Sequence, residues 1–280
     1  MGTPRISVLI HTRNEERWIA DCIRSAVWAD EIVIADMVST DATRSIAEGL
    51  GARVVEVPMA KNVDEVRNEA MRSCTGDWLL VVDADERVSA GLAARVREIV
   101  QAPAADAYWV PRKNYFLDTW MRHSLWPDPQ MRFFRRGVAS WSGVVHEAAQ
   151  IRGSCATLPA DPGLALEHPG ACFDITLFFQ KYVRYSALEL ERTAAMSEVG
   201  FVQFLIRRTV GEFINRYFGG GWREGMAGLV FSAMRVACHL MVAAQVYARD
   251  HSAWREVSPV ALRRQVRWEG LRSAIKLLRP

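Results

Sequence analysis

The sequence lacks several features that would place it in a simple class. None of its five cysteines belongs to a Cys-x-x-Cys pair, so neither a zinc knuckle nor a disulfide framework is indicated. It has no internal repeat, and its net charge of +3 is too small to argue for nucleic acid as a partner. No charged and then apolar leader opens the chain, which favours a cytoplasmic protein in a reducing compartment.

The chain does contain enough apolar residues for a large core. Half of its 280 residues are hydrophobic, so it can bury one large domain and a smaller annex. In the first 101 residues, short apolar runs alternate with amphipathic segments. The expected strands cover 6–10, 31–35, 53–57 and 78–83, and the expected helices cover 16–27, 41–49, 63–73 and 90–101. This alternation predicts an α/β fold with a mostly parallel sheet and helices on both faces.

The second half of the chain has a different texture. After Ala107, aromatic and basic segments with prolines predict shorter and partly antiparallel strands. From Asp174 onward helical periodicity dominates, and we expect breaks near Gly200, near 219–221 and near Ser258.

We therefore expect a catalytic domain over 1–172 and a helical region over 173–280. Within the helical region, 225–248 is long enough to cross a bilayer of roughly 30 Å. Arg235, His239 and Gln245 interrupt it, which favours an interfacial or buried helix over a spanning one. The tail is basic, with Arg263, Arg264, Arg267, Arg272, Lys276 and Arg279. Together these features predict peripheral contact with the inner face of the plasma membrane. An ordinary helical subdomain or a homodimer surface is an equal alternative.

The clearest chemical feature is an apolar run that ends in three acids. Residues 78–82 read Trp-Leu-Leu-Val-Val, and Asp83, Asp85 and Glu86 follow. Ligands gather beyond the carboxyl ends of parallel strands, and residues two apart in an extended segment point the same way. A cation with oxygen ligands, Mg²⁺ or Mn²⁺, relieves the repulsion and leaves positions for phosphates. Taken alone, such acids more often begin a helix; the rest of the chain favours the metal site.

Further motifs occur in a fixed order along the chain. They are the runs at 6–16, 28–36, 39–41, 66–68, 76–78 and 83–86, followed by those at 110–116, 126–128, 131–135, 145–147 and 184–186. This ordered set resembles family 2 glycosyltransferases, and within them the branch that contains the lipopolysaccharide inner-core β-1,4-glucosyltransferases. The resemblance implies a GT-A, Rossmann-like fold and an inverting transfer of a sugar from a nucleotide diphosphate.

The resemblance also implies roles for particular residues. The nucleotide sugar, with UDP-glucose as the leading donor, would be bound by Thr12, Arg13, Asn14, Glu15, Asp36, Arg67, Asp83 and Ala84. Within this set, Asp36 would accept from a uracil N–H. The metal would be held by Asp85, with His146 completing the shell.

Simpler alternatives exist for several of these positions. Asn14, Ser39 and Thr40 are typical helix caps, and Arg67 could be a solvated helix charge. Val38 follows Met37 where the family has small residues, and neither side chain tolerates the positive φ that glycine allows. We therefore expect the loop after Asp36 to take a different path from the family's loop.

An inverting transferase needs a general base for the acceptor hydroxyl, and a carboxylate is the usual solution. Asp128 is the first candidate, because Pro127 and Pro129 stiffen its loop. Glu147, paired with His146, is the alternative. In a simpler interpretation, His146 and Glu147 form a buried hydrogen bond that only holds two strands together.

The sequence thus predicts a cytoplasmic, membrane-associated, metal-dependent inverting glycosyltransferase. It would move glucose from UDP-glucose to a saccharide or lipid-linked saccharide, such as the lipopolysaccharide core. A polyprenyl-phosphate glycosyltransferase and a catalytically silent scaffold that binds nucleotide sugar or membranes are the alternatives. A nucleotidyltransferase is disfavoured, because no glycine-rich phosphate loop follows the first expected strand.

Overall fold

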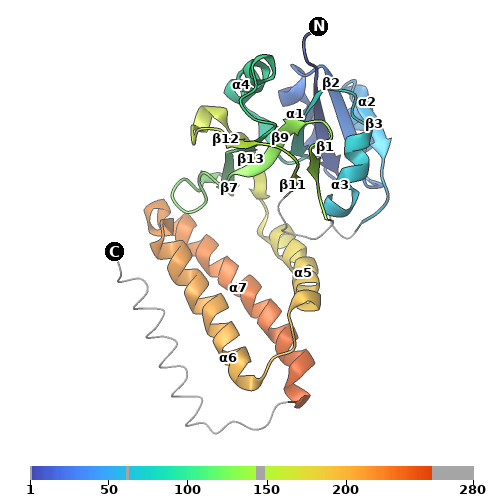
Figure 1. The fold of residues 1–280 in the computed structure, drawn as a ribbon. Coiled ribbons are helices and arrows are strands. Elements are labelled where there is room, and N and C mark those ends of the chain that lie inside the picture. The colour runs from blue at the N-terminus through green and yellow to red at the C-terminus, as the bar shows by residue number, and fades with distance from the viewer. Residues whose placement is uncertain (1, 61–62, 143–148, 254–280) are drawn as a thin grey trace. The chain divides into compact units, whose positions relative to one another are not determined.

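The computed structural model describes residues 2–60, 63–142 and 149–253 (Figure 1). The chain divides into two compact units, the first formed by residues up to 115 with 125–171 and the second by 116–124 with the residues from 172 onward. The sequence predicted a single boundary after residue 172. In the structure, residues 116–124 also belong to the helical unit.

The first unit is built on a mixed sheet in which the described strands lie in the order β12-β6-β9-β4-β1-β2-β3. These strands are β1 (Ile6–Thr12), β2 (Glu31–Asp36), β3 (Arg53–Glu56), β4 (Trp78–Asp83), β6 (Ala107–Val110), β9 (Gln130–Arg135) and β12 (Cys155–Thr157). Strand β1 is parallel to β2 and β4, whereas β9 is antiparallel to both β4 and β6. The carboxyl ends of β1, β2 and β4 therefore meet at one edge of the sheet.

Helices cover both faces of this sheet. They are α1 (Ile19–Ala26), α2 (Thr43–Gly49), α3 (Val63–Arg72), α4 (Ala90–Gln101) and the short 3-10 turn η1 (Pro162–Leu164). Alternate residues of β1 explain the two faces, because Val8 and Ile10 pack with α1 and α4 while Leu9 packs with α3. The expected α/β sheet with helices on both faces is confirmed.

Smaller strands complete the first unit. Strands β5 (Arg87–Val88), β13 (Leu166–Cys172) and β7 (Arg112–Phe116) lie side by side in a second sheet, in which β13 is antiparallel to β5. Strands β10 (Ala139–Ser140) and β11 (Gln150–Ile151) form a separate antiparallel pair. The short strands expected after Ala107 are thus present, and β7 and β13 carry side chains to the acids that follow β4.

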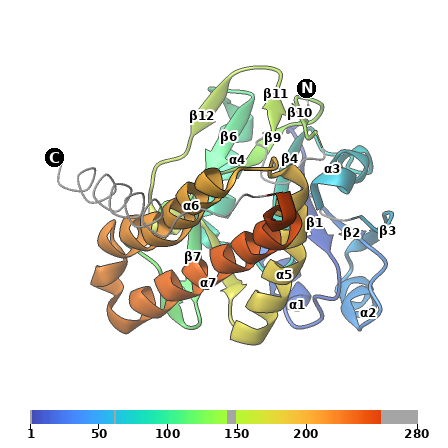
Figure 2. The ribbon, with the colours of Figure 1, turned by 90° about the horizontal axis from the view of Figure 1, so that it is seen from below.

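The second unit is helical, as expected. It contains β8 (Thr119–Trp120), α5 (Ile175–Arg192), α6 (Glu198–Ile206), two π-helical turns, η2 (Arg207–Gly211) and η3 (Ile214–Phe218), the 3-10 turns η4 (Gly221–Glu224) and η5 (His251–Ala253), and α7 (Gly225–Asp250). Helices α6 and α7 lie side by side (Figure 2). The break expected near Gly200 lies a few residues earlier, between α5 and α6. Ser197 caps α6 by accepting from the Gly200 N–H, so Gly200 itself lies inside the first turn.

Candidate functional site

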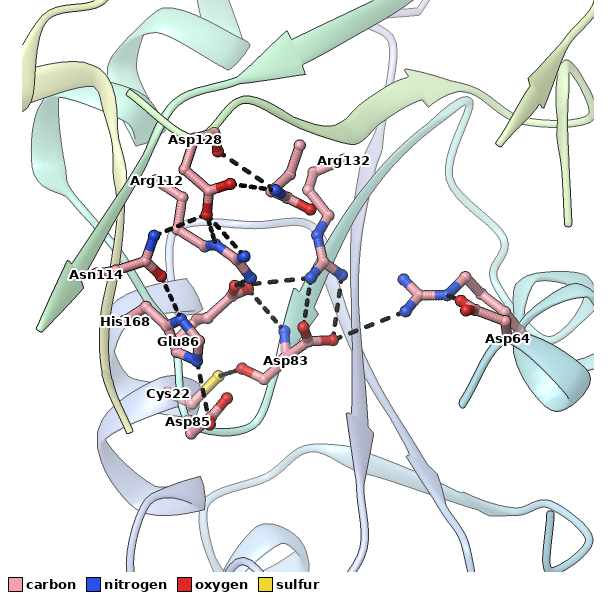
Figure 3. Close-up of polar contacts among 12 residues, drawn as sticks. Cys22, Asp64, Asp83, Asp85, Glu86, Arg112, Asn114, Asp128, Arg132 and His168 are labelled. Carbon is pink, nitrogen blue, oxygen red and sulfur yellow. Dashed lines mark hydrogen bonds and ion pairs between the residues drawn. The ribbon is translucent and has the colours of Figure 1, made fainter. Parts of the chain in front are cut away.

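Asp83, the last residue of β4, forms an ion pair with an arginine from the neighbouring strand (Figure 3). Both terminal nitrogens of Arg132 contact the Asp83 carboxylate, with Nη1 3.1 Å from Oδ1. Arg67 Nη2 lies 3.9 Å from the same Oδ1. Burial alone would raise the pKa of Asp83, but Arg132 and Arg67 hold it well below its usual range. The repulsion between the acids is therefore relieved by arginines of the chain itself.

Glu86 is fully buried and closes the turn after β4. Its Oε2 accepts from the Asp83 N–H at 3.0 Å, and its Oε1 lies 3.0 Å from Arg112 Nη1 and 3.6 Å from Arg132 Nη2. Helix α4 begins only at Ala90, where the Ser89 hydroxyl accepts from the Leu92 N–H. The reading of these acids as the start of the helix is therefore wrong, because serine supplies the cap.

The predicted base Asp128 is held by several donors. Its Oδ2 accepts from Arg112 Nε at 2.9 Å, Arg112 Nη2 at 2.8 Å and Asn114 Nδ2 at 2.7 Å. Its Oδ1 accepts from Gln130 Nε2 at 3.1 Å, and its backbone φ is 40°. A carboxylate that acts as base must turn an unshared electron pair toward the acceptor hydroxyl. Three donors occupy Oδ2 and one donor contacts Oδ1, so Oδ1 is the less occupied oxygen of Asp128.

The predicted metal ligand Asp85 faces a histidine that the sequence analysis missed. His168 Nε2 lies 3.2 Å from Asp85 Oδ2, and His168 Nδ1 lies 2.8 Å from Asn114 Oδ1. Asn114 donates its amide group to Asp128, so it presents its oxygen to His168. His168 Nδ1 therefore carries the proton, and Nε2 is the ring atom directed to Asp85.

Strand β13 also makes room for Asp85. Gly170 follows His168 by two residues and lies on the same face of β13. A β-carbon at Gly170 would lie 2.3 Å from the Asp85 Cβ. Glycine is therefore required at this position for Asp85 and His168 to meet.

The loops that follow β1 and β2 are tied to each other. The Asn14 N–H donates to Ser39 Oγ at 2.9 Å, and Asn14 Oδ1 accepts from the Thr40 N–H at 2.8 Å. Asp36 is fully buried, and its two oxygens accept from the Ser39 hydroxyl and N–H. Helices α1 and α2 begin at other residues without a side-chain cap. Asn14, Ser39 and Thr40 thus join loops rather than cap helices.

The expectation that Val38 cannot take a positive φ is wrong, because its φ is 55°. The hydrogen bonds between Asp36 and Ser39 close the turn around Val38 and fix this conformation. The Val38 side chain is exposed, so the unusual backbone does not force it into the core.

Polar atoms without partners lie at the end of β1. Both ring nitrogens of His11 and the Thr12 hydroxyl are buried and have no hydrogen bond to any described residue. Burial, followed by the nearby Arg67, lowers the pKa of His11 well below its usual value, so the ring is neutral. His11 is paired in register with Asp83 of β4. Buried polar groups are normally satisfied, so this cluster indicates a polar ligand.

The remaining predicted donor residues have different surroundings. Arg67 is buried, with Nε 3.3 Å from Asp64 Oδ1 and its guanidinium 5.0 Å from the centre of the Trp141 ring. The reading of Arg67 as a solvated charge is therefore wrong. Ala84 is buried, Arg13 is exposed, and the Glu15 N–H donates to Thr43 Oγ1 at 2.8 Å.

The two remaining predicted site residues, His146 and Glu147, lie outside the described residues, as does the basic tail. The sequence analysis gave no individual role to His11, Arg112, Asn114 or His168, and it named Glu86 only as one of the acids after the fourth expected strand. One of these residues could have been found from the sequence: His11 is a polar side chain near the end of a mostly apolar strand, β1. Within the described ranges, His, Cys, Asp and Glu side chains do not form a cluster of three suited to a metal.

Comparison with known families gives a match over residues 7–152 to the family described as glycosyl transferase family 2. This range is more than half of the chain and contains β4, β9 and all of β1 except its first residue. It also contains Asp83, Asp85 and Asp128.

Similar proteins match the chain either over most of its length or over about a third of it. LpsC of Rhizobium meliloti (strain 1021), a lipopolysaccharide core biosynthesis glycosyltransferase, is 26% identical over 254 residues, which cover 87% of this chain and 92% of that protein. An uncharacterized glycosyltransferase of Rickettsia bellii (strain RML369-C) is 39% identical over 107 residues, covering 38% of this chain and 36% of that protein. This match thus spans about a third of the Rickettsia protein.

Two solved structures are similar to part of the chain. The first is S. aureus TarS, which is 18% identical with a TM-score of 0.44 and covers 76% of this chain and 43% of that chain. The second is glucosyl-3-phosphoglycerate synthase from Mycobacterium tuberculosis in complex with Mn²⁺, UDP and glucosyl-3-phosphoglycerate. It is 25% identical with a TM-score of 0.35 and covers 40% of this chain and 45% of that chain. The family predicted from the ordered motifs is confirmed by the family match: the chain belongs to glycosyltransferase family 2.

Proposed function

We propose that this chain is an inverting, metal-dependent glycosyltransferase that moves glucose from UDP-glucose to a saccharide or lipid-linked acceptor such as the lipopolysaccharide core. The observation that carries the proposal is the edge where β1 and β4 end. There, unpartnered polar atoms of His11 and Thr12 lie beside Asp83, and the Asp85–His168 pair follows directly. The similarity to LpsC over most of both chains supports the acceptor class.

Asp85 and His168 are suited to hold the cation, Mg²⁺ or Mn²⁺. A carboxylate oxygen and an imidazole nitrogen 3.2 Å apart form a mixed donor set that manganese accepts. Asn114 holds the His168 Nδ1–H, which is the usual support of a metal-binding histidine and leaves Nε2 for the ion. His146 remains the proposed further ligand. When bound, the cation offsets the charge of the departing diphosphate.

The donor nucleotide is proposed to occupy the ends of β1 and β2. His11 and Thr12 offer donors and acceptors that have no partner among the described residues, and Arg67 is the charged residue that most lowers the pKa of His11. Asp36 was proposed to bind uracil, but Ser39 holds both of its oxygens. Asp36 would therefore position the loop. Its carboxylate would bind the uracil only if the Ser39 hydroxyl turned away.

The general base is proposed to be Asp128 or Glu147. Asp128 accepts a hydrogen bond from Asn114, which also contacts His168. Asp128 and His168 therefore belong to the same hydrogen-bond network. Whichever carboxylate acts, it takes the proton of the acceptor hydroxyl on the face opposite the diphosphate.

Donor and acceptor screening tests the proposed reaction. Purified protein with Mn²⁺ is offered UDP-glucose and other nucleotide sugars, and release of the nucleotide is measured with core oligosaccharide or polyprenyl phosphate as the acceptor. We expect UDP release that depends on the oligosaccharide. Transfer only to polyprenyl phosphate would favour the alternative enzyme, and the absence of release with every donor would favour the silent scaffold.

We further propose a cytoplasmic location with peripheral contact at the inner face of the plasma membrane. Four exposed apolar side chains follow at intervals of four residues around the bend into α7: Phe218, Trp222, Met226 and Val230. In the described part of the chain, one helix, Gly221–Asp250, is long and apolar enough to cross a membrane, and 44% of its most apolar window is buried. Such partial burial favours contact with a membrane surface over crossing. Association of two copies through this surface is the alternative.

Removing two of these side chains should weaken membrane binding. We expect the Trp222→Ala, Met226→Ala double variant to bind anionic vesicles at least about tenfold more weakly than wild type, because two apolar groups leave the interface. Co-sedimentation with vesicles measures this, and Val27→Ala, which alters an exposed valine directly after α1, is the control. Wild-type protein that stays on membranes in both high salt and alkaline carbonate would instead indicate an integral span.

A further inference from the structure

The helix after α6 is irregular around one acid. The π-helical turns η2 (Arg207–Gly211) and η3 (Ile214–Phe218) lie on either side of Glu212 and Phe213. π-helical turns are rare and are frequently found at functional sites. Glu212 is therefore a position to search for a function outside the sheet edge.

Three basic side chains converge on a single oxygen of Glu212. Arg216 places Nε at 2.9 Å and Nη2 at 2.8 Å from Oε1. From α7, Arg235 Nε lies 3.5 Å and His239 Nε2 lies 3.9 Å from the same oxygen. His239 and Arg216 lower the pKa of Glu212 to about 2, so it is ionised. One carboxylate thus faces two guanidinium groups, and positive charge is in excess.

Arg235 carries the excess charge. Its guanidinium lies 4.9 Å from the centre of the Tyr182 ring, and its Nε is buried without a hydrogen bond to any described residue. Among the described residues, Glu212 is the one carboxylate that forms an ion pair with Arg235, through Nε. Burial lowers the pKa of Arg235, as expected for a cation with too little anionic compensation. The side chain is 20% exposed, so a ligand can reach it.

We propose that Arg235, with Arg216 and His239, binds a phosphate group in the helical unit. A guanidinium binds phosphate through two parallel N–H bonds, and the terminal nitrogens of Arg235 have this geometry available. All of the residues involved lie in the helical unit, so the site goes beyond the proposed transfer reaction and uses none of its groups. The phosphate belongs either to a soluble phosphate ester or to the headgroup of a lipid.

Titration of the full-length chain with inorganic phosphate, followed by calorimetry, tests the site. Phosphate bound at the proposed donor site contributes equally to wild type and to variants of the helical unit, so the difference between them reports on the helical site. We expect saturable binding by wild type and at least tenfold weaker binding by Arg235→Gln, since hydrogen bonds to a charged group are lost. Arg235→Lys should bind with intermediate affinity, because it keeps the charge but not the fork. Arg207→Gln, which removes an exposed arginine of the same unit, should bind as wild type does.

Vesicles containing phosphatidic acid distinguish the two sources. Release of bound phosphate by these vesicles, but not by phosphatidylcholine vesicles, would identify a lipid headgroup. Release by glycerol phosphate alone would identify a soluble ester. Equal phosphate binding by wild type and a folded Arg235→Gln protein, or no binding by wild type, would overturn the proposal. UDP release from UDP-glucose reports separately on the proposed transfer reaction.

Discussion

Replacing Asp85 with alanine is expected to lower sugar transfer by roughly 10³-fold or more while the protein stays folded. Asp85 faces His168, and the ion pairs of Asp83 and Glu86 with Arg132 do not depend on it. The variant therefore loses a ligand of the proposed cation while these ion pairs remain. Single-turnover transfer from UDP-glucose measures the loss, and circular dichroism measures folding.

Asp21→Ala is the matched control for Asp85→Ala, because Asp21 is a partly exposed acid of α1 that pairs with Arg24 and Arg87. It should transfer at nearly the wild-type rate. Excess EDTA should reproduce the Asp85→Ala defect in the wild-type protein, and added Mn²⁺ should reverse it. Full activity of a folded Asp85→Ala variant, or of wild type in excess EDTA, would disprove the assignment of the metal.

The second large effect concerns the base. Asp128→Asn is expected to lower transfer by roughly 10²–10⁴-fold while the affinity for UDP-glucose stays near that of wild type. Asparagine can present its oxygen to Arg112 and Asn114, and Gln130 can rotate its amide to accept from the new NH₂ group. The network therefore survives, but the side chain no longer takes a proton at neutral pH.

Glu147→Gln is the companion variant. It should show the same profile only if Glu147 is the base. Donor affinity and single-turnover transfer, measured on both variants, separate these roles. A nearly wild-type rate for Asp128→Asn would reject Asp128, and weaker donor binding in either variant would indicate a role in binding.

Features that are local in the sequence were predicted well. The alternation of apolar runs and amphipathic segments predicted the strands and helices of the first 101 residues, and α4 has the expected bounds of Ala90–Gln101. The acids after β4 were found because a continuous apolar strand ends at Asp83. Parallel strands end at one edge, so a single local pattern was enough to locate this part of the candidate site.

Features that depend on distant partners were not predicted. His168 lies 83 residues from Asp85, and no local pattern links the two. Arg112 and Asn114 lie on a strand that pairs outside the main sheet, so their meeting with Asp128 depends on the second sheet. The conformation of Val38 was missed for a related reason. Side-chain hydrogen bonds decide it, whereas the sequence reading relied on residue preference alone.

The ion pairs at the edge of the sheet bear on whether folding depends on the proposed cation. Asp83, Glu86 and Asp128 are balanced by Arg132 and Arg112, which are built into the same unit. In domains whose folding depends on a metal, the ion itself offsets the charge of its ligands. Here the chain offsets most of that charge before any ion arrives. We therefore expect the protein to fold without the proposed cation, which would then enter and leave with the diphosphate while the fold persists.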